Sequence, residues 1–372
     1  MRKKNFISTL FFVLFFLYPS ISYCYYCNEC YSWDCLHERR MSSSSDMTEV
    51  CEEPCVEIKG CLSWFNNCFN FDLLFRGYVE YLYWNVLEGE TDYMVKNVPN
   101  EGTATVATIG DIVSANFNFN SGFRVGGIVK SRCSSWEIDG SYTSYGTDGK
   151  NFNELSSDAT TIFNGTFAEL TSTSPTKITS KIQINTDIWN LIAARRFFLC
   201  SDFEARLLMG ISGAFLNQDW KFSYVGTNTN NYHLKWNFTG TGLRFGAEGV
   251  WNVIKNFGII GKFSTALFYG SYVNEGKMVI LVTDEDPQLF YDFSLEQQRI
   301  VPHLQLSFGP QYKINWKCWE MDIYALYEIN LFDNIHYVLQ SESGRSIDGK
   351  DARHMNSMTG SQGLTLGFKL AF

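Results

Sequence analysis

The sequence ends in Ser361-Gln-Gly-Leu-Thr-Leu-Gly-Phe-Lys-Leu-Ala-Phe372, and this stretch decides the fold class. Leucine or phenylalanine occupies positions 364, 366, 368, 370 and 372, and small or polar residues stand between them. A period of two residues places alternate side chains on opposite faces of a β-strand. We therefore expect a final strand with one apolar and one polar face. A strand of a membrane-spanning barrel and an ordinary edge strand of a soluble protein would both show this pattern. The rest of the chain has to decide between these two possibilities.

The same alternation recurs along the chain from residue 73 onward. It predicts further strands at residues 75–83, 117–129, 136–143, 178–188, 203–215, 257–269, 300–312 and 319–329. One more strand is predicted to follow a hairpin at residues 227–230, and its later half is residues 243–251. The parity of the apolar side chains switches near Gly240–Gly242, where we expect a β-bulge. Residues 160–170 leave room for an additional hairpin.

The connections between these strands alternate in length. Short turns are predicted near residues 131, 197, 254 and 316, and longer connections near 100, 160, 228, 285 and 350. Transmembrane barrels combine tight periplasmic turns with long outer loops, and strands of about 9–11 residues cross the bilayer. A soluble β-sandwich has no reason to sort its loops by length. We therefore predict an all-β fold, a transmembrane antiparallel β-barrel of about ten strands (eight to twelve) within residues 73–372.

Aromatic residues are concentrated near the predicted strand ends. We expect two girdles at the membrane interfaces, where amphipathic rings are most stable. The periplasmic girdle would contain Trp136, Trp189, Phe197, Phe198, Trp251, Phe257, Trp316, Trp319 and Phe372, and the outer girdle Trp220, Tyr224, Tyr232, Trp236 and Tyr272.

The composition and the N-terminus narrow the class further. The 372 residues carry a formal charge of −9 and no basic stripe, which argues against nucleic acid as a partner. A basic start at Met1–Lys4, an apolar run over 6–18 and small residues at 20–22 predict a signal peptide at residues 1–22. The apolar run is shorter than the roughly 20 residues of a membrane-spanning helix. Residues 23–72 would then form a periplasmic segment before the barrel.

Cysteines are concentrated in this segment. The disulfide candidates are Cys24, Cys27, Cys30, Cys35, Cys51, Cys55, Cys61 and Cys68, together with Cys133, Cys200 and Cys318 at predicted periplasmic turns. Two of the spacings would suit zinc. An exported chain meets an oxidising compartment, however, so disulfides are the better interpretation and we expect no metal. The cross-links would join the segment to itself, to the turns or to neighbouring envelope proteins, unless the turn cysteines stay free as small apolar residues.

Four motifs resemble one family. They are Gly77-Tyr-Val-Glu-Tyr-Leu-Tyr-Trp84, Gly122-Phe-Arg-Val-Gly126, Gly242-Leu-Arg-Phe-Gly246 and Gln362-Gly-Leu-Thr-Leu-Gly367. In this order they resemble the pore-forming outer-membrane proteins of the Legionella major-outer-membrane-protein type, which has chlamydia-like relatives. The resemblance covers about residues 74–372. A last strand ending in Phe372 also resembles the signal by which outer-membrane barrels are recognised for assembly.

The resemblance implies a location and partners. It implies the bacterial outer membrane, with membrane lipid and the barrel-assembly machinery as partners, and neither a cofactor nor catalytic residues. The Cys-rich segment departs from the family pattern. It fits an envelope in which disulfide-linked proteins, or copies of this chain as a homo-oligomer, have a structural role.

The polar face of the strands defines the candidate site. The inward residues expected to line a pore are Arg76, Glu80, Arg124, Glu137, Asp139, Lys181, Asp187, Glu204, Arg206, Arg244, Glu248, Lys262, His303, Glu320, Asp322, Glu328 and Lys369. We expect passive diffusion of small polar solutes and ions, as in a porin, with a weak preference for cations. The alternative is a structural, cross-linked or adhesive envelope barrel with a blocked lumen, since narrow barrels fill their interior with side chains.

No motif of an enzyme accompanies this pattern. The sequence contains neither a nucleophile elbow nor a phosphate-binding loop. A remote alternative is an outer-membrane hydrolase in which His233 with Asp219, or His336 with Asp333, activates water. A surface histidine among polar neighbours is the simpler interpretation, and we expect no enzymatic activity.

Overall fold

A computed structural model describes residues 73–89, 91–99, 111–131, 135–154, 161–165, 175–282, 285–316, 319–341 and 352–371. The chain divides into two units, residues 1–63 and 64–372, and every described residue belongs to the second unit. These residues contain no helix that is long and apolar enough to cross a membrane. The predicted signal peptide and Cys-rich segment lie outside the described residues.

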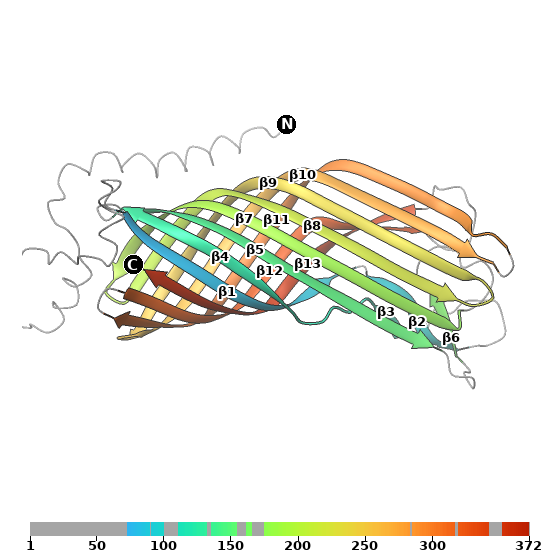
Figure 1. Ribbon diagram of the computed structural model, residues 1–372, viewed down its shortest axis with the longest axis horizontal. Coiled ribbons are helices and arrows are strands. Elements are labelled where there is room, and N and C mark those ends of the chain that lie inside the picture. The colour runs from blue at the N-terminus through green and yellow to red at the C-terminus, as the bar shows by residue number, and fades with distance from the viewer. Residues whose placement is uncertain are drawn as a thin grey trace, which may run out of the picture. The chain divides into compact units, whose positions relative to one another are not determined.

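Ten antiparallel strands form a closed barrel, which confirms the predicted fold class (Figure 1). They are β1 (Leu73–Glu88), β4 (Asn120–Ser131), β5 (Trp136–Glu154), β7 (Lys177–Cys200), β8 (Phe203–Val225), β9 (Thr229–Ile254), β10 (Phe257–Leu281), β11 (Gln288–Trp316), β12 (Trp319–Ser341) and β13 (Ala352–Ala371). Barrel strands that follow one another in the chain are paired, and β1 closes the ring between β4 and β13. Tyr78 of β1, for example, lies opposite Gly126 on one side and Lys369 on the other.

Three short strands form a second sheet in the order β3–β2–β6. They are β2 (Asp92–Pro99), β3 (Asp111–Ser114) and β6 (Thr161–Gly165). Strand β6 falls within the stretch 160–170 that left room for a hairpin, but it pairs with β2 and does not enter the barrel wall.

The two ends of the barrel differ in their connections. At the turn end, on the left of Figure 1, residues 201–202 join β7 to β8 and residues 255–256 join β9 to β10. The loop end carries the connections through β2, β3 and β6 and the connections 226–228 and 282–287. The predicted long connection near 228 is wrong, because β8 and β9 continue until only residues 226–228 are left between them.

The strands are much longer than a bilayer requires. Strands β8, β9, β10 and β11 contain 23, 26, 25 and 29 residues, whereas about 9–11 residues suffice to cross the hydrocarbon core. About half of each of these strands is therefore not needed to cross the hydrocarbon core and lies in different surroundings.

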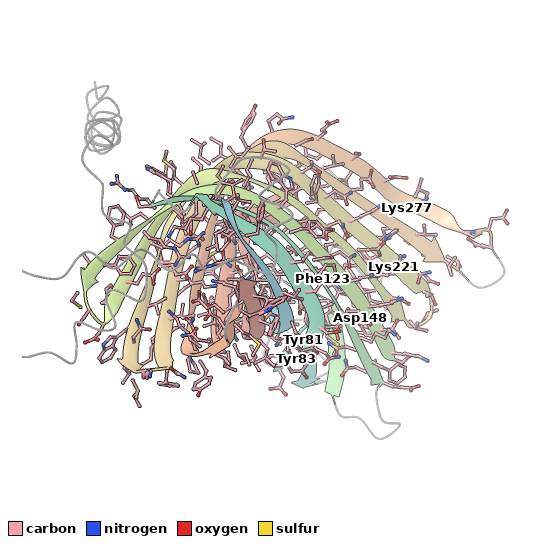
Figure 2. The ribbon with its side chains drawn as sticks, turned by 60° about the vertical axis from the view of Figure 1, so that its left-hand side comes forward. Tyr81, Tyr83, Phe123, Asp148, Lys221 and Lys277 are labelled. Carbon is pink, nitrogen blue, oxygen red and sulfur yellow. The ribbon has the colours of Figure 1, made fainter. Side chains whose placement is uncertain are left out.

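The outward side chains show where that environment changes. On β8 the outward Leu207, Ile211 and Phe215 are apolar and about half exposed, whereas Asp219 and Lys221 continue the same face. We call the wall from the turn end to Phe215 of β8, and the equivalent part of the other strands, the belt half, and the remainder the loop half. Figure 2 shows the outward Tyr81, Tyr83 and Phe123 of the belt half and the outward Asp148, Lys221 and Lys277 of the loop half.

The inward side chains change in the opposite sense. In the belt half they are polar, as at Arg206 and Ser212 of β8, and in the loop half they are apolar, as at Leu216 and Trp220. The predicted bulge near Gly240–Gly242 is wrong, since Gly240, Thr241 and Gly242 pair in unbroken register with Gly270, Tyr269 and Phe268. The same alternate residues therefore point inward on both sides of these glycines. What changes along the strand is polarity: inward residues are polar in the belt half and apolar in the loop half.

A hydrophobic core fills the lumen of the loop half. Its buried members come from the barrel and from the segment between β1 and β4, and they are Leu82, Trp84, Val86, Tyr93, Met94, Ala115, Phe117, Tyr145, Ile178, Ile182, Ile184, Trp220, Phe222, Tyr224, Tyr232, Met278 and Ile280. The predicted outer girdle is wrong for the same reason. All of its members, Trp220, Tyr224, Tyr232, Trp236 and Tyr272, are buried.

The barrel lumen as the candidate functional site

Most of the predicted inward residues lie on the inner face of the belt half. They are Arg76, Glu80, Arg124, Glu137, Asp139, Glu204, Arg206, Arg244, Glu248, Lys262, His303, Glu320, Asp322, Glu328 and Lys369. Their inward position is a feature of the fold, and it does not by itself establish a conducting pore.

Lys181 and Asp187 were assigned to the wrong face. Lys181 is exposed on the outer surface, and Asp187 accepts a hydrogen bond from the exposed hydroxyl of Tyr142 at 2.8 Å. Their even-numbered neighbours Ile182 and Ile184, which the sequence suggested for the lipid side, belong to the core of the loop half. Apolar residues alternate with polar ones on β7 as on a belt strand, but in this part of β7 the polar face points outward and the apolar face points inward.

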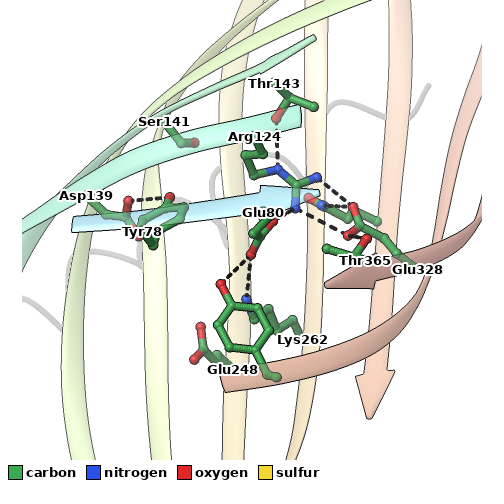
Figure 3. A network of polar contacts seen from close by, with 12 residues as sticks. Tyr78, Glu80, Arg124, Asp139, Ser141, Thr143, Glu248, Lys262, Glu328 and Thr365 are labelled. Carbon is green, nitrogen blue, oxygen red and sulfur yellow. Dashed lines mark hydrogen bonds and ion pairs between the residues drawn. The ribbon is translucent and has the colours of Figure 1, made fainter. Parts of the chain in front are cut away.

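Arg124 is the centre of the first polar cluster (Figure 3). Its guanidinium forms ion pairs with Glu80 and with Glu328, the latter at 2.7 Å, and donates to the hydroxyl of Thr143 at 2.8 Å. Glu80 also accepts a hydrogen bond from the hydroxyl of Tyr324 at 2.7 Å. Arg124 of β4 thus pairs with a buried carboxylate of β1 and with one of β12, the two strands on either side of β13.

Glu328 collects several further donors. The side chains of Gln305, Asn330 and Thr365 donate to its carboxylate at 2.6, 3.2 and 3.0 Å. The Thr365 hydroxyl accepts in turn from the indole of Trp84 at 3.1 Å. A buried carboxylate is stable only when its lone pairs are satisfied in this way, so this part of the lumen is packed and does not resemble free solvent.

Arg206 and Arg196 form the second cluster, nearer the turn end. Arg206 forms ion pairs with Glu137, Asp139 and Glu248, the last two at 2.9 and 3.3 Å. Arg196 pairs with Glu137 at 2.9 Å and with Glu204 at 2.7 Å. Sequence reasoning missed Arg196, because residues 195–201 read as a turn, whereas β7 continues to Cys200.

Arg244 is different, because all its partners are neutral. Its guanidinium donates to the hydroxyls of Ser212 and Ser264, each at 2.8 Å, and to the amide oxygen of Gln305 at 2.7 Å. A further contact of 3.1 Å joins it to Nδ1 of His303. Only 4% of Arg244 is exposed, and no carboxylate of the described residues lies within 4.0 Å of it.

A cavity of about 120 Å³ lies among these clusters. Its charged lining consists of Arg124, Arg206, Arg244, Lys262, Lys369, Glu80, Asp139 and Glu248. Such a volume holds several water molecules. The cavity lies in the belt half and reaches the edge of the apolar core at Trp84, which lines it.

The segment between β1 and β4 contributes the centre of that core. Tyr93 and Met94 of β2 are completely buried, and the Tyr93 ring lies 6.4 Å from that of Trp220 in an edge-on arrangement. The hydroxyl of Tyr224 donates to the backbone carbonyl of Tyr93. Asn153 donates to the hydroxyl of Tyr93 at 3.3 Å, and burial raises the pKa of this hydroxyl. β2 is therefore fixed to the inner wall by both packing and hydrogen bonds.

Two glycines of the family-like motifs have a steric role in the lumen. Gly126 lies opposite Tyr78 and Gly367 opposite Tyr324, and a Cβ at either glycine would lie 2.3 or 2.1 Å from the tyrosine ring. The rings lie flat over the glycines and point their hydroxyls at Asp139 and Glu80. The motifs thus set the orientation of the two tyrosines.

Of the two histidine–aspartate pairs of the hydrolase alternative, His233 and Asp219 have described side chains. Nε2 of His233 lies 3.1 Å from a carboxylate oxygen of Asp219, and Lys221 lies 3.3 Å from the other oxygen. The group lies on the outer face of the sheet and not in a cavity. His336 lies in β12, but its side chain is outside what the structure describes. Within the described residues no cluster of His, Cys, Asp or Glu has an arrangement that could hold a metal ion.

Cys200 is the one disulfide candidate that the described residues include. It is exposed and free at the end of β7, next to the turn 201–202. Cys133, Cys318, the eight cysteines before the barrel and the terminal Phe372 all lie outside the described residues.

A closed antiparallel barrel with an apolar outer belt and a polar interior defines an outer-membrane β-barrel protein. Residues 74–372 match the model of the family described as Legionella pneumophila major outer membrane protein precursor, and the chain belongs to this family. No curated protein matches the sequence.

Solved outer-membrane barrels resemble the fold at low identity. The outer membrane protease OmpT of Escherichia coli has 9% identity and a TM-score of 0.42, over 80% of this chain and 97% of its own. The toluene transporter TodX of Pseudomonas putida has 7% identity and a TM-score of 0.28, over 81% and 89%. A FadL homologue of Pseudomonas aeruginosa has 7% identity and a TM-score of 0.25, over 81% and 90%. Similarity at this level gives no indication of activity.

Proposed function

We propose that this protein is a structural barrel of the bacterial outer membrane whose lumen is closed to solutes. The observation that supports this most is the apolar core of the loop half, in which Trp220, Phe222 and Tyr93 occupy the interior that a channel would need. Opening a path would separate packed aromatic rings and expose them to water, at about 25 cal/mol per Å² of apolar surface. A core of this kind stabilises a wall that extends beyond the membrane.

The belt half supports the same proposal. A barrel of ten strands lies near the narrow end of the range of barrel sizes, where side chains fill the interior. Arg124, Arg196 and Arg206 are each paired with at least two carboxylates. Direct ion pairs across a lumen leave less room for water than separated charges do. The cysteine cross-links expected for residues 23–72 would attach such a barrel to neighbouring envelope proteins.

A narrow channel is the second candidate, and the charged cavity favours it. Buried ionisable residues inside a membrane protein often mark a path for ions, and the cavity is lined by Arg244 and Lys369 in addition to the paired residues. Basic side chains outnumber acidic ones in its lining. A channel through this level would therefore prefer anions, in contrast to the cation preference expected from the whole inner face.

Single-channel recording in planar bilayers distinguishes the two functions. The purified barrel, shown to be folded by its heat-modifiable migration on gels, is expected to give no conductance steps. A variant in which residues 91–115 are replaced by a short Gly-Ser linker removes Tyr93 and Met94 from the core and serves as the comparison. Reproducible steps from the unmodified protein would refute the closed lumen and establish the channel.

A further inference from the structure

A row of basic residues crosses the outer face of the loop half. Lys150 of β5 lies directly opposite Lys181 of β7, which lies directly opposite Lys221 of β8. The row continues through His233 of β9 to Lys277 of β10. Neighbouring strands lie about 4.8 Å apart, so the row extends over roughly 19 Å of the wall. Figure 2 shows Lys221 and Lys277 on the outside of the barrel.

The row is electrostatically unfavourable by itself. Like charges directly opposite each other on neighbouring strands destabilise a sheet, and all four lysines are exposed. Three of them have a carboxylate nearby: Lys150 with Asp148 at 3.9 Å, Lys221 with Asp219 at 3.3 Å and Lys277 with Asp292 at 4.0 Å. Exposed pairs of this kind contribute little. Lys181, between Lys150 and Lys221, has no carboxylate of the described residues within 4.0 Å.

The row lies in the loop half, beyond the apolar belt. On β8 the last exposed apolar residue is Phe215, and Lys221 follows six positions later on the same face. At about 3.3 Å per residue this is roughly 20 Å along the strand. Barrel strands tilt by about 35–45°, so the height above the belt is roughly 15 Å. The large saccharide headgroup of a lipid anchored in the same leaflet reaches this height.

We propose that the lysine row binds an anionic glycolipid of the leaflet at the loop end, through phosphate groups on its saccharide headgroup. A phosphate at Lys181 would accept hydrogen bonds from its ammonium group and from those of Lys150 and Lys221. It would replace the repulsion between the three lysines by attraction. A membrane-anchored ligand is favoured over a soluble polyanion, because headgroups beside the belt have a high effective concentration at the row.

Native mass spectrometry of the detergent-solubilised full-length protein tests the proposal. The probe is a glycolipid with a bisphosphorylated oligosaccharide headgroup, titrated to obtain a dissociation constant. The variant K150Q/K181Q/K221Q is expected to bind on the order of 100-fold more weakly. Lys235 lies on the same outer face as His233, two residues nearer the belt along β9. It lies opposite Asp219 of β8. The matched control K235Q is expected to bind within about twofold of the unmodified protein.

Each other outcome has a definite meaning. Equal retention of the glycolipid by the triple variant and the unmodified protein would overturn the proposal, provided that both show heat-modifiable migration. Equal retention after enzymatic removal of the phosphates would also overturn it. If the same oligosaccharide without acyl chains binds as tightly as the glycolipid, the assignment to a membrane-anchored ligand is wrong. Affinity is expected to fall as the salt concentration rises.

Discussion

The belt half and the loop half are built from the same strands, yet they place their apolar side chains on opposite faces. In the belt half Ile211 and Phe215 point outward and Arg206 points inward, whereas in the loop half Lys221 points outward and Trp220 inward. The backbone is continuous across the boundary, so the difference arises from the surroundings. Lipid favours apolar residues on the outside, and water favours them in the interior.

The comparison predicts where charge is indispensable. Replacing Arg124 by Met removes the cation from Glu80 and Glu328, both of them buried. We expect a loss of about 5 kcal/mol in the free energy of unfolding, because breaking a buried pair leaves unpaired charge. Unfolding in urea, followed by the gel shift of the folded barrel, measures it.

Arg244→Met is the matched control for that experiment. Arg244 is even more deeply buried than Arg124 but has only neutral partners, so its loss leaves no carboxylate unpaired. We expect a loss smaller by a factor of two or more. Equal losses for the two variants would show that the ion pairs are not what stabilises the belt half.

The loop half should depend on its apolar core in the same way. Trp220 is 1% exposed, and Trp220→Ala is expected to cost about 4 kcal/mol through lost burial and a cavity. Phe215→Ala, five residues away, removes an outward ring that is 43% exposed, and we expect less than about 1 kcal/mol because lipid fills the space. Limited proteolysis should cut the loop half of the Trp220 variant first. A larger cost at Phe215 would refute the assignment of inner and outer faces.

Exchanging polarity on the outer face probes the boundary itself. Ile211→Lys places a charge in the belt and is expected to cost about 3 kcal/mol. The reverse change, Lys221→Ile, lies in the loop half and should alter stability by about 0.5 kcal/mol or less. Both values follow from urea titrations in lipid vesicles. If the lysine is tolerated at position 211, the belt has been placed wrongly.

The smallest expected effect concerns the attachment of β2. Tyr224→Phe removes the hydroxyl that donates to the carbonyl of Tyr93 but keeps the ring in the core. We expect a loss of about 1 kcal/mol, the usual net contribution of one hydrogen bond. Faster amide hydrogen exchange confined to residues 92–94 would locate the effect. Unchanged exchange there would show that packing alone holds β2.

The strand pattern could be predicted from sequence because it is local. Alternation at Leu364, Leu366 and Phe368 depends only on the period of a strand, and it yielded the barrel and the positions of its strands. The same pattern does not tell which medium surrounds a strand. Ile182 and Ile184 were therefore placed on the lipid side, and Lys181 in the lumen.

The candidate site was predictable only in part for a related reason. Inward charges such as Arg206 and Glu137 follow from the parity of belt strands, but their pairing depends on the register of strands far apart in sequence. Arg196 was missed because the end of β7 resembled a turn. The contribution of Tyr93 to the lumen could not be predicted, since it comes from a connecting segment that folds back inside the wall.

Paramagnetic relaxation of backbone amides in lipid nanodiscs tests the central claim most directly, namely that the wall leaves the membrane near Phe215 of β8. A nitroxide at the end of a lipid acyl chain and a water-soluble gadolinium chelate are added to separate samples. We expect the lipid probe to broaden the amide signals of residues 207–215, and the aqueous probe to broaden those of outward residues 219–223. Broadening of Lys221 by the lipid probe, at the level seen for Ile211, would contradict the exchange of polarity between the two halves.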